Sequence, residues 1–423
     1  MTVRRFDVAS WLDSPMSRRR FDLSRFGAER AVVAEICAQV MTGGDEALRE
    51  LSQKFDGWSP GLGETFEVPP ADVKQAVDRI DSRDLSALEL AARRIREFHE
   101  RQVQPPSVGS PGLKLLTRPV RRAGVYAPGG RAAYPSTVLM TAIPARVAGV
   151  EEVVLATPPR ADGSVPAGIL AAAHVAGVDA VYRVGGAQAI AAFAYGTASI
   201  PRVDVVAGPG NIYVTLAKKE VFGSVGVDGI AGPTEVVVLA DASARPDFVA
   251  ADLAAQLEHD PLAWGVLITD SLQVADRVVE ELEDLVRGLE RAEIIHAATC
   301  CVIVADDMDQ AVDLANDFAP EHLLVVAADA ERLASRVRNA GAVFVGPFST
   351  VPLGDYVAGP NHTLPTSGAA RFASPLGVHA FLKRTSVLSL NRGDLEDLRD
   401  ATVRLAALEG LGAHAHAVEV RLE

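Results

Sequence analysis

The sequence has few cysteines, few aromatic residues and no excess of positive charge. It contains three cysteines, Cys37, Cys300 and Cys301, and the last two are adjacent. Three thiols cannot form a disulfide framework, so we expect a reducing compartment, the cytoplasm. The formal net charge is −14. This balance argues against a nucleic-acid partner, because phosphate binding requires a basic face.

Long apolar runs are also missing. No run reaches the length that spans a bilayer, and the N-terminal MTVRRFDVASW lacks the apolar stretch of a signal peptide. We therefore expect no membrane partner. Apolar residues nevertheless make up 48% of the 423 residues, which is enough to bury a core. A chain of this length predicts two or more domains.

Predicted strands and helices alternate in two stretches of the chain. The first follows the strand AGVYAP and ends with a helix at about 211–222; the second runs from Glu235 to the strand AVFVG. The strands are continuous Val and Leu runs, as expected when helices cover both faces of a parallel sheet. The sequence predicts an α/β protein with two doubly wound, Rossmann-like parallel-sheet domains of similar architecture, plus small N- and C-terminal helical extensions.

Outside these stretches the pattern is less regular. Residues 1–26 are polar and rich in arginine, and we expect an extended arm with one short helix. A helix from about residue 28 should end at Gly43-Gly44, where Asp45 would cap a second helix. The Gly- and Pro-rich segment from residue 347 to about 375 predicts irregular structure.

The segment DFVAADLAAQLEHDP predicts an amphipathic helix that ends before Pro261. Gln256 and His259 are three residues apart, so a helix would make them neighbours. Together with Asp355 and His414, which lie near glycines, they supply two nitrogen and two oxygen donors. This set suits Zn²⁺ and also Mn²⁺, Co²⁺ or Fe²⁺. A glutamine ligand favours a metal that also binds substrate; the alternative is a solvated Gln and a capping His.

A carboxylate and an imidazole stand side by side before the predicted strand HLLVVA. Glu321 and His322 could exchange protons near neutral pH. On a regular strand they would point to opposite faces, so both can reach one site only if the backbone after Pro320 is irregular. The alternative is a loop glutamate followed by a histidine that merely starts the strand.

Nucleotide binding has no standard signature in this sequence. Neither G-x-G-x-x-G nor a P-loop occurs. Two turns between a strand and a helix are rich in glycine instead, at residues 185–188 (GGAQ) and 208–211 (GPGN). Such turns let a phosphate approach a helix N-terminus. The alternative is that both are tight turns with a structural role only.

Several segments resemble those of the histidinol dehydrogenase family and follow in that family's order. They are GDEALRELSQKFDG, STVLMTAIPARVAGV, VGGAQAIAAFAYGT, GPGNIYV, AGPTEVVVLAD, LAAQLEHD, APEHLLV, GDYVAGPNHTLPT and EGLGAHAHAV. The resemblance covers the chain from about Phe6 to Val420. It implies a homodimer with one Zn²⁺ per subunit. It also implies oxidation of L-histidinol to L-histidine with two NAD⁺, through histidinaldehyde, as the last step of histidine biosynthesis.

The resemblance also implies roles for individual residues. Gln256, His259 and Asp355 would bind Zn²⁺ together with His414 of the partner subunit, so that each site is shared. The metal would hold nitrogens of the substrate and would not perform the redox step. These four ligands would therefore contact the substrate as well.

The remaining roles concern proton transfer and ligand contacts. His322 would take the alcohol proton and contact the substrate, and Glu321 would activate water on the aldehyde. Further contacts implied by the resemblance are Thr234, His362 and Glu409 with the substrate, and Tyr126, Gln188 and Asn211 with NAD⁺. Two positions depart from the family: Thr234 replaces a common serine, and Val351 replaces a glutamate found in many members.

The expected domain boundaries follow from these roles. Residues 27–125 and 235–376 would form a discontinuous first domain that carries the metal and catalytic residues. Residues 126–234 would form the second domain, on the NAD⁺ side. A small extension domain is expected from residues 1–26 and 377–400, and a C-terminal segment reaching the partner subunit from residues 401–423.

Three other functions stay open at this point. A paralogue that oxidises another polar alcohol, such as a sulfonated diol, would be distinguished by a panel of substrates. A Zn²⁺ hydrolase with Glu321 as base would not depend on NAD⁺. A non-catalytic binding protein would leave the many titratable groups at strand ends without a purpose.

Overall fold

The computed structural model describes residues 2–18, 22–61, 63–129 and 133–423. The chain divides into two compact units, which we call the main unit and the terminal unit. The main unit comprises Met1–Gln102 and Val120–Phe381, and the terminal unit comprises Val103–Pro119 and Leu382–Glu423. Both parallel sheets belong to the main unit.

One sheet of the main unit has five strands in the order β6-β5-β4-β7-β8. Its strands are β4 (Arg122–Tyr126), β5 (Glu152–Thr157), β6 (Ala180–Arg183), β7 (Val205–Ala207) and β8 (Gly226–Val227). All of its pairings are parallel. The order reverses between β4 and β7, which is the switch point of a doubly wound sheet, where ligands commonly bind.

The other sheet has six strands in the order β1-β11-β10-β9-β12-β13. Its strands are β1 (Val3–Asp7), β9 (Glu235–Ala240), β10 (Trp264–Thr269), β11 (Thr299–Val304), β12 (His322–Val326) and β13 (Ala342–Val345). All pairings are again parallel. Apart from the added edge strand β1, the two sheets share one strand order. The prediction of two doubly wound sheets of similar architecture is confirmed.

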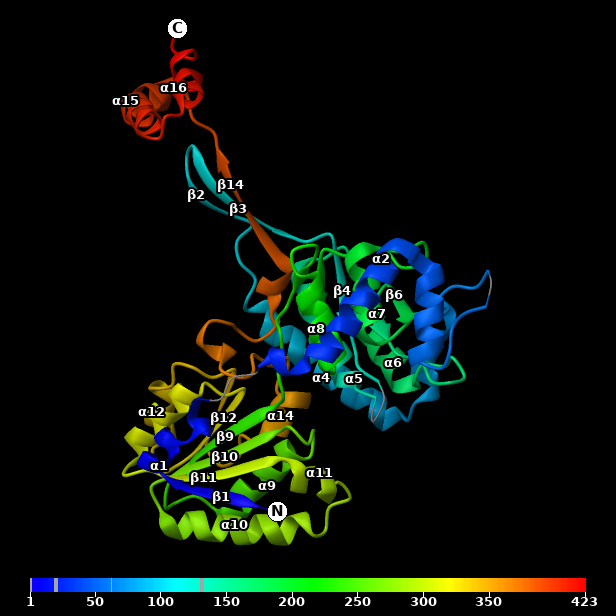
Figure 1. Cartoon of the computed structure of the whole chain (residues 1–423), viewed down its shortest axis with the longest axis vertical. Coiled ribbons are helices and arrows are strands. Elements are labelled where there is room, and N and C mark those ends of the chain that lie inside the picture. The colour runs from blue at the N-terminus through cyan, green and yellow to red at the C-terminus, as the bar shows by residue number, and fades with distance from the viewer. Residues whose placement is uncertain (1, 19–21, 62, 130–132) are drawn as a thin grey trace. The chain divides into compact units, whose positions relative to one another are not determined.

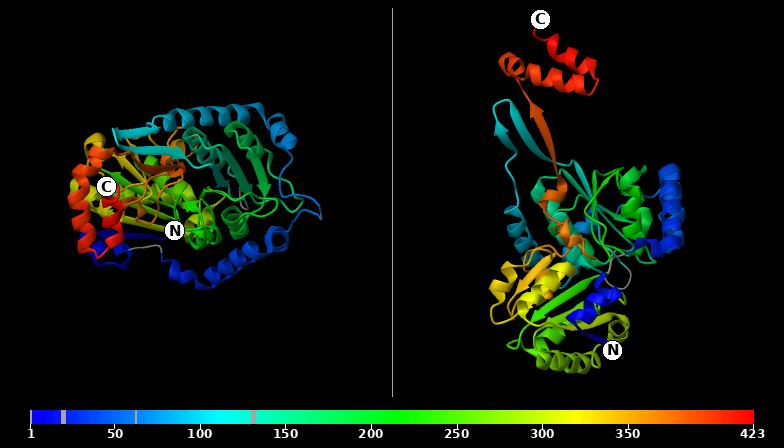
Figure 2. Two further views of the ribbon diagram at one scale, coloured as in Figure 1. Left: turned by 90° about the horizontal axis from the view of Figure 1, so that it is seen from above. Right: turned by 60° about the vertical axis from the view of Figure 1, so that its left-hand side comes forward.

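Helices cover both faces of the five-stranded sheet (Figures 1 and 2). One face packs against α4 (Ser82–Glu100), α5 (Pro135–Ala148) and α6 (Ala167–Ala176), with α3 (Pro70–Gln75) beside α6. The other face packs against α2 (Gly27–Phe55), α7 (Gly186–Tyr195) and α8 (Ile212–Val221). Within α2, Gly44 is non-helical, with φ 53° and ψ −131°, so the helix breaks where the sequence predicted.

The six-stranded sheet is covered in the same way. On one face lie α9 (Pro246–Leu257), α10 (Leu272–Val286) and α11 (Ala292–Ala297), joined by the first residue of α14 (Val351–Tyr356). On the other lie α1 (Val8–Asp13), α12 (Met308–Phe318) and α13 (Ala330–Ser335). The strands are buried on both faces, which explains their continuous apolar sequence.

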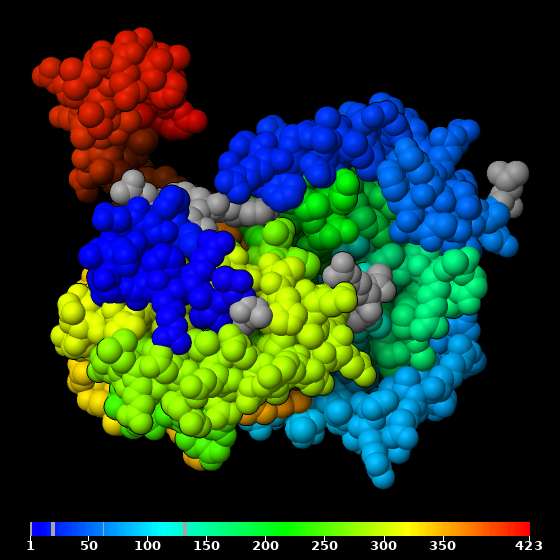
Figure 3. Space-filling model, turned by 60° about the horizontal axis from the view of Figure 1, so that its bottom comes forward, coloured from blue at the N-terminus to red at the C-terminus, as the bar shows by residue number. Residues whose placement is uncertain are grey.

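The N-terminal residues do more than form the extended arm that we expected. Val3–Asp7 pairs in parallel with β11 as an edge strand, and Arg5 forms an ion pair with Asp276 of α10. In Figure 3 these dark-blue residues lie on the yellow-green surface of the six-stranded sheet's layers. The strand VRRFD has no apolar run because it is an edge strand with mostly exposed side chains. Residues 1 and 19–21 of the expected arm lie outside the described residues.

The grouping of segments differs from the domain boundaries that we expected. Residues 27–125 were assigned to the domain of the six-stranded sheet, yet α2, α3 and α4 pack in the two core clusters of the five-stranded sheet, and β4 is one of its strands. Their apolar positions predicted that they would be amphipathic, but they did not reveal which sheet would receive them. The segment TFEV, which precedes α3, forms an isolated bridge between Glu67 and Tyr182.

The terminal unit combines an antiparallel sheet with two helices. The sheet has the order β14-β3-β2 and is formed by β2 (Ser107–Ser110), β3 (Leu113–Pro119) and β14 (Leu382–Leu388). The helices are α15 (Arg392–Leu408) and α16 (Gly412–Glu419). Within α15, Ala406 is the only buried residue. This unit therefore has almost no core of its own among the described residues.

Short 3-10 helices complete the structure. They occupy Pro15–Arg18, Leu23–Phe26, Ala76–Arg79, Ala369–Arg371 and Val378–Phe381. In the described part of the chain, no helix combines the length and the apolar character that a bilayer span requires.

Candidate active site

A cavity of about 610 Å³ lies between the two sheets of the main unit. From the five-stranded sheet it is lined by residues that follow β4 and β7, including Gly129 and Asn211. From the six-stranded sheet it is lined by Thr234, which precedes β9, and by His322, which begins β12. The cavity thus joins the carboxyl edge of one sheet to the amino edge of the other.

Helix α9 brings the two predicted metal ligands to this cavity. Pro246 starts the helix and its apolar residues are buried against the sheet. The helix ends at Leu257, and His259 lies in the following turn, where its backbone N–H contacts the carbonyl of Gln256 at 3.3 Å. Gln256 is 2% exposed, and both side chains line the cavity. The helix thus ends three residues earlier than the predicted end immediately before Pro261.

The backbone before β12 is irregular, as the neighbouring Glu321 and His322 require. Ala319 ends α12 in the left-handed conformation, with φ 52°. Glu321 lies immediately before β12. His322 is the first residue of β12 and pairs with Val236 and Ala342. Both Glu321 and His322 line the cavity. The predicted convergence of these two side chains is therefore present.

The carboxylate of Glu321 is buried and held by two donors. The hydroxyl of Thr234 donates to Oε2 at 2.5 Å, and the backbone N–H of Glu235 donates to the same oxygen at 3.0 Å. Burial raises the pKa of Glu321 above its usual value, although the charge of His322 and the Thr234 hydrogen bond oppose this. The group therefore holds a proton more readily than an exposed glutamate would.

The imidazole of His322 lies between backbone and carboxylates. Its Nδ1 is 3.3 Å from the carbonyl oxygen of Glu235 and 3.6 Å from Glu321 Oε2. Its Nε2 is 3.5 Å from Asp355 Oδ1, beyond good hydrogen-bond geometry, and has no hydrogen-bond partner among the described residues. Burial lowers the pKa of His322, but the neighbouring carboxylates outweigh it and the net shift is upward.

Asp355 reaches the cavity from α14, a short helix in the segment that we expected to be irregular. Val351 at its start is 3% exposed and packs in the core beside α9. The hydroxyl of Thr350 also donates to Asp252 of α9. Burial alone would raise the pKa of Asp355. The contact with His322 and the charge of its ring lower this pKa by a larger amount, so the net shift is downward.

His362 is held beside Asp355. Its Nδ1 lies 2.9 Å from the carbonyl oxygen of Asp355, and its Nε2 lies 3.4 Å from the hydroxyl of Thr137. Burial lowers its pKa, so its neutral form is favoured. Neither Thr137 nor the lining residue Arg291 was singled out in the sequence, because nothing in its local pattern sets either apart.

The donors on this chain fit part of a metal site. Gln256, His259 and Asp355 line one cavity, and Gln256 Oε1 is buried without a hydrogen-bond partner in the described structure. An unpaired buried oxygen is costly unless a ligand meets it. No three His, Cys, Asp or Glu side chains in the described stretches converge as a metal site would. Further donors are therefore needed.

Two predicted site residues belong to the terminal unit. Glu409 follows α15, Gly410 has φ 71°, and His414 lies in α16. The break between the helices agrees with the glycines in the sequence. The relation of Glu409 and His414 to the cavity stays a prediction.

The predicted nucleotide residues lie at the carboxyl edge of the five-stranded sheet, in different settings. Asn211 lines the cavity and caps α8, accepting from the backbone N–H groups of Tyr213 and Val214 at 3.0 and 3.2 Å. Tyr126 and Gln188 are 3% and 1% exposed and are not among the lining residues. They lie behind the glycine turn that begins α7.

Asp56 completes that turn and was missed in the sequence. The hydroxyl of Tyr126 accepts from Gly186 N–H at 3.0 Å. Asp56 accepts from Gly185 N–H at 3.3 Å and from the amide of Gln188 at 3.2 Å. Burial raises the pKa of Asp56.

Comparisons with known proteins agree with one another. A family model described as histidinol dehydrogenase matches residues 20–422. A histidinol dehydrogenase of Synechococcus is 51% identical over 398 residues, covering 92% of each chain. One from Parasynechococcus marenigrum is 49% identical over 412 residues, covering 96% of this chain and 93% of the other. The crystal structure of histidinol dehydrogenase from Elizabethkingia anophelis superposes with a TM-score of 0.89 at 32% identity, covering 99% and 98% of the chains.

Proposed function

Because this chain belongs to the histidinol dehydrogenase family, we propose that its cavity oxidises L-histidinol to L-histidine in two steps, with a hydride passing to NAD⁺ in each. The observation that carries the proposal is the pairing of Glu321 with His322 in one cavity that also reaches Asn211. The family makes the chain an oxidoreductase of histidine biosynthesis. The rival hydrolase would leave the nucleotide edge of the cavity unused.

His322 is the proton acceptor of the first step. Its Nδ1–H donates to the carbonyl of Glu235, which leaves Nε2 with a free lone pair in the cavity. The substrate hydroxyl gives its proton to Nε2. At the same time the carbon that bears this hydroxyl gives a hydride to the nicotinamide, and histidinaldehyde results. The carboxylates of Glu321 and Asp355 stabilise the imidazolium that forms.

Glu321 acts in the second step, which consumes water. The carboxylate takes a proton from the water that adds to the aldehyde carbon, and the second hydride then leaves that carbon to give the acid. The pKa of Glu321 is raised by burial, which suits a base that works near neutral pH. Thr234, His362 and Glu409 complete the proposed contacts with the substrate.

Zn²⁺ is the metal that we propose for this cavity. Gln256, His259 and Asp355 would hold it with His414 of the partner subunit, one ion in each subunit's site. A bound ion would supply a Lewis-acid centre for nitrogen donors of the substrate. The buried Gln256 Oε1 without a partner supports this assignment.

A homodimer with shared sites is the assembly that we propose. The terminal unit exposes apolar side chains, including Leu405 at 61% and Leu408 at 83%. Large exposed leucines in one segment favour contact with another chain. The same segment carries Glu409 and His414. The three cysteines are buried, and none of them forms a disulfide in the described part of the chain, which supports a reducing cytoplasm.

The amount of NADH formed from L-histidinol tests the activity. We expect about two NADH per substrate consumed, because both oxidations occur in one site. One NADH per substrate, or none, would contradict the proposal. Oxidation of a sulfonated diol with no activity on histidinol would favour the paralogue.

Mixing two inactive variants tests whether sites are shared. His414→Asn should lose metal and activity with the fold intact, and Glu321→Gln should be inactive for a different reason. In a heterodimer, one site receives neither substitution, so part of the activity should return. No recovery in verified heterodimers would rule out sharing.

A further inference from the structure

The hydroxyl group of Thr234 lies between the candidate metal ligand Gln256 and the candidate base Glu321. The amide nitrogen of Gln256 contacts Thr234 Oγ1, and the same oxygen is 2.5 Å from Glu321 Oε2. The three side chains come from the end of α9, the residue before β9 and the residue before β12. They are far apart in sequence and lie in one row along the wall of the cavity.

The direction of these hydrogen bonds follows from counting protons. Glu321 Oε2 already accepts the backbone N–H of Glu235, so it is an acceptor in this row. The single hydroxyl proton of Thr234 therefore goes to Glu321. With that proton used, the hydroxyl can only accept from Gln256. The group facing Thr234 must then be the NH₂ end of the Gln256 amide.

This assignment fixes the other end of the amide. With its NH₂ group on Thr234, Gln256 turns Oε1 away from the row, where the oxygen is buried without a partner in the described part of the chain. Oxygen, not nitrogen, is the amide atom that binds a metal ion. A flipped amide would offer NH₂ to the metal and leave Thr234 facing an oxygen.

Thr234 is itself well fixed. Its carbonyl oxygen accepts the backbone N–H of Trp264 at 3.0 Å, which ties it to the start of β10. Threonine is β-branched and has fewer accessible rotamers than the serine that is common here in the family. The hydroxyl is thus held in one place from which it can serve both neighbours.

We propose that Thr234 is a positioning residue that orients the Gln256 amide toward the metal and the Glu321 carboxylate toward water, beyond any contact with the substrate. The inference rests on the proposed function for the identity of the metal and of the two oxidation steps. It predicts that loss of the Thr234 hydroxyl lowers both the affinity for the metal and the rate of the second oxidation step.

Metal affinity without substrate is the first test. Thr234→Val keeps the shape of the side chain but can neither accept from Gln256 nor donate to Glu321. We expect it to weaken Zn²⁺ binding by about 10- to 100-fold in a chelator competition, the usual effect of removing a group that orients a ligand. Thr234→Ser keeps the hydroxyl and should lie within about threefold of the unaltered protein, by the same reasoning.

A second threonine gives a matched control. Thr137 also lines the cavity, but its hydroxyl faces His362 and touches neither Gln256 nor Glu321. Thr137→Val should leave Zn²⁺ affinity unchanged. If Thr234→Val binds Zn²⁺ as tightly as the unaltered protein and only raises the KM for histidinol, Thr234 is a substrate contact and the proposal is wrong.

The two oxidation steps give an independent readout. In Zn²⁺-saturated enzyme, Thr234→Val should slow oxidation of supplied histidinaldehyde more than oxidation of histidinol, because only the second step needs Glu321 to activate water. Equal slowing of both steps would contradict the part played by Glu321. If Thr234→Val does not fold, Thr234→Ala removes the same hydroxyl without adding a methyl group and carries both tests.

These outcomes separate the inference from the proposed function. Chelator competition needs no substrate, so it reports on Thr234 even if the protein does not oxidise histidinol. Loss of Zn²⁺ affinity in Thr234→Val together with inactivity of the unaltered protein on histidinol would reject the function and retain the positioning role. Unchanged Zn²⁺ affinity in Thr234→Val, together with activity of the unaltered protein on histidinol, would reject the positioning role alone.

Discussion

The two sheets of the main unit have the same strand order but use opposite edges. In the five-stranded sheet, the cavity lies at the carboxyl ends of β4 and β7, where the order reverses. The turn after β7 is open there because of its glycines. Gly208 has φ 125°, and a Cβ at this position would stand 2.2 Å from the carbonyl oxygen of Tyr126. Only glycine allows this approach.

The same place in the six-stranded sheet is closed by the protein itself. Asp241, which follows β9, accepts the backbone N–H of Ala328 after β12 at 2.8 Å and that of Ser243 at 2.9 Å. One carboxylate thus joins the loops on both sides of the switch point. No glycine occurs between β9 and α9.

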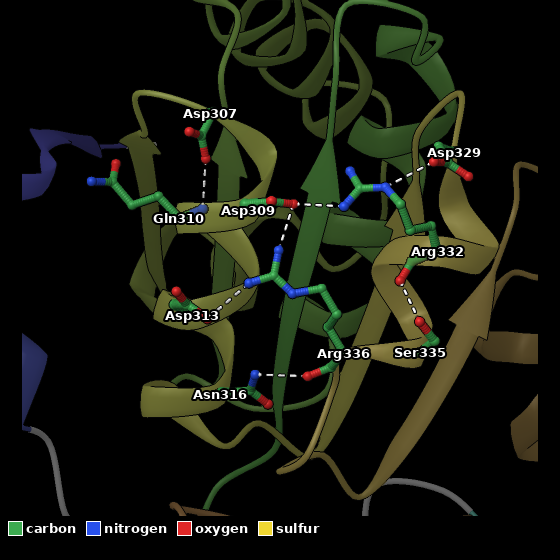
Figure 4. Close-up of polar contacts among 9 residues, drawn as sticks. All are labelled: Asp307, Asp309, Gln310, Asp313, Asn316, Asp329, Arg332, Ser335 and Arg336. Atoms are coloured by element: carbon green, nitrogen blue, oxygen red, sulfur yellow. Dashed lines mark hydrogen bonds and ion pairs between the residues drawn. The ribbon is translucent and has the colours of Figure 1, made fainter.

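Helices α12 and α13 are also joined beside this edge (Figure 4). Asp309 forms ion pairs with Arg332 and Arg336 at 2.8 and 2.6 Å, and Arg336 approaches Asp313 at 3.5 Å. These groups are largely exposed, so they add little stability individually. The charged side chains pair with one another and so join the two helices.

Strand order alone therefore does not locate the cavity. The rule that ligands bind at carboxyl ends holds for one sheet, while the other contributes Thr234 and Glu321 from loops before its strands. Substitutions at the two edges should therefore separate catalysis, cofactor binding and stability.

The largest effect is expected at the amino edge of the six-stranded sheet. His322→Asn keeps a donor for the Glu235 carbonyl but removes the proton acceptor at Nε2. We expect NADH formation from histidinol to fall by about 10²- to 10⁴-fold, the usual contribution of a general base. Circular dichroism and Zn²⁺ content should be unchanged. Activity above a tenth of the original would show that another group takes the proton.

Two matched substitutions, one at the carboxyl edge of each sheet, should have smaller effects. Both should lower stability, but only one should weaken NAD⁺ binding. Asn211→Ala and Asp241→Ala each remove an acceptor of two backbone N–H groups. Each should lower the free energy of unfolding by about 1 kcal/mol, as the loss of a cap does. Only Asn211→Ala should also raise the KM for NAD⁺, by about tenfold, a loss of roughly 1.4 kcal/mol in binding.

Steady-state kinetics with varied NAD⁺, alongside denaturant unfolding, would measure both quantities. A comparable rise in KM for Asp241→Ala would mean that the six-stranded sheet's switch point also takes part in nucleotide binding. Unchanged KM in both variants would remove Asn211 from the proposed NAD⁺ site.

The sequence was sufficient where local pattern decides the structure. Continuous Val and Leu runs predicted the central strands, and the break at Gly44 and the end of α9 were close to their predicted places. The edge strand β1 and the short helix α14 were missed because exposed edges and single turns have no clear period.

The arrangement of the site depended on contacts that no local pattern encodes. Gln256, His259 and Glu321 were recognised as chemical groups, and the structure places them in one cavity. Their location at the amino edge of the six-stranded sheet could not be predicted, because it depends on how the two sheets face each other. Nor could the Thr234 hydrogen bonds, which join residues far apart in the chain.

The smallest expected effect is a difference in pH dependence between two aspartates. Burial raises the pKa of Asp56 at the five-stranded sheet. Burial also acts on Asp241, but hydrogen bonds from Ser243 and Ala328 outweigh it and lower that pKa. The folded state thus holds the Asp56 proton more tightly than the unfolded chain does, and the Asp241 proton less tightly. Their contributions to stability must change with pH in opposite directions.

As pH rises from the usual aspartate pKa through the raised value of Asp56, stability falls, so Asp56→Asn should stabilise the protein at neutral pH. As pH falls through the lowered pKa of Asp241, stability is lost. Asp241→Asn should therefore destabilise the protein at neutral pH and make its stability depend less on pH in the acid range. Both changes should be on the order of 0.5 kcal/mol, because the groups are partly exposed. Denaturant unfolding from pH 3 to 8 measures them, and shifts of the same sign would contradict the contrast between the two edges.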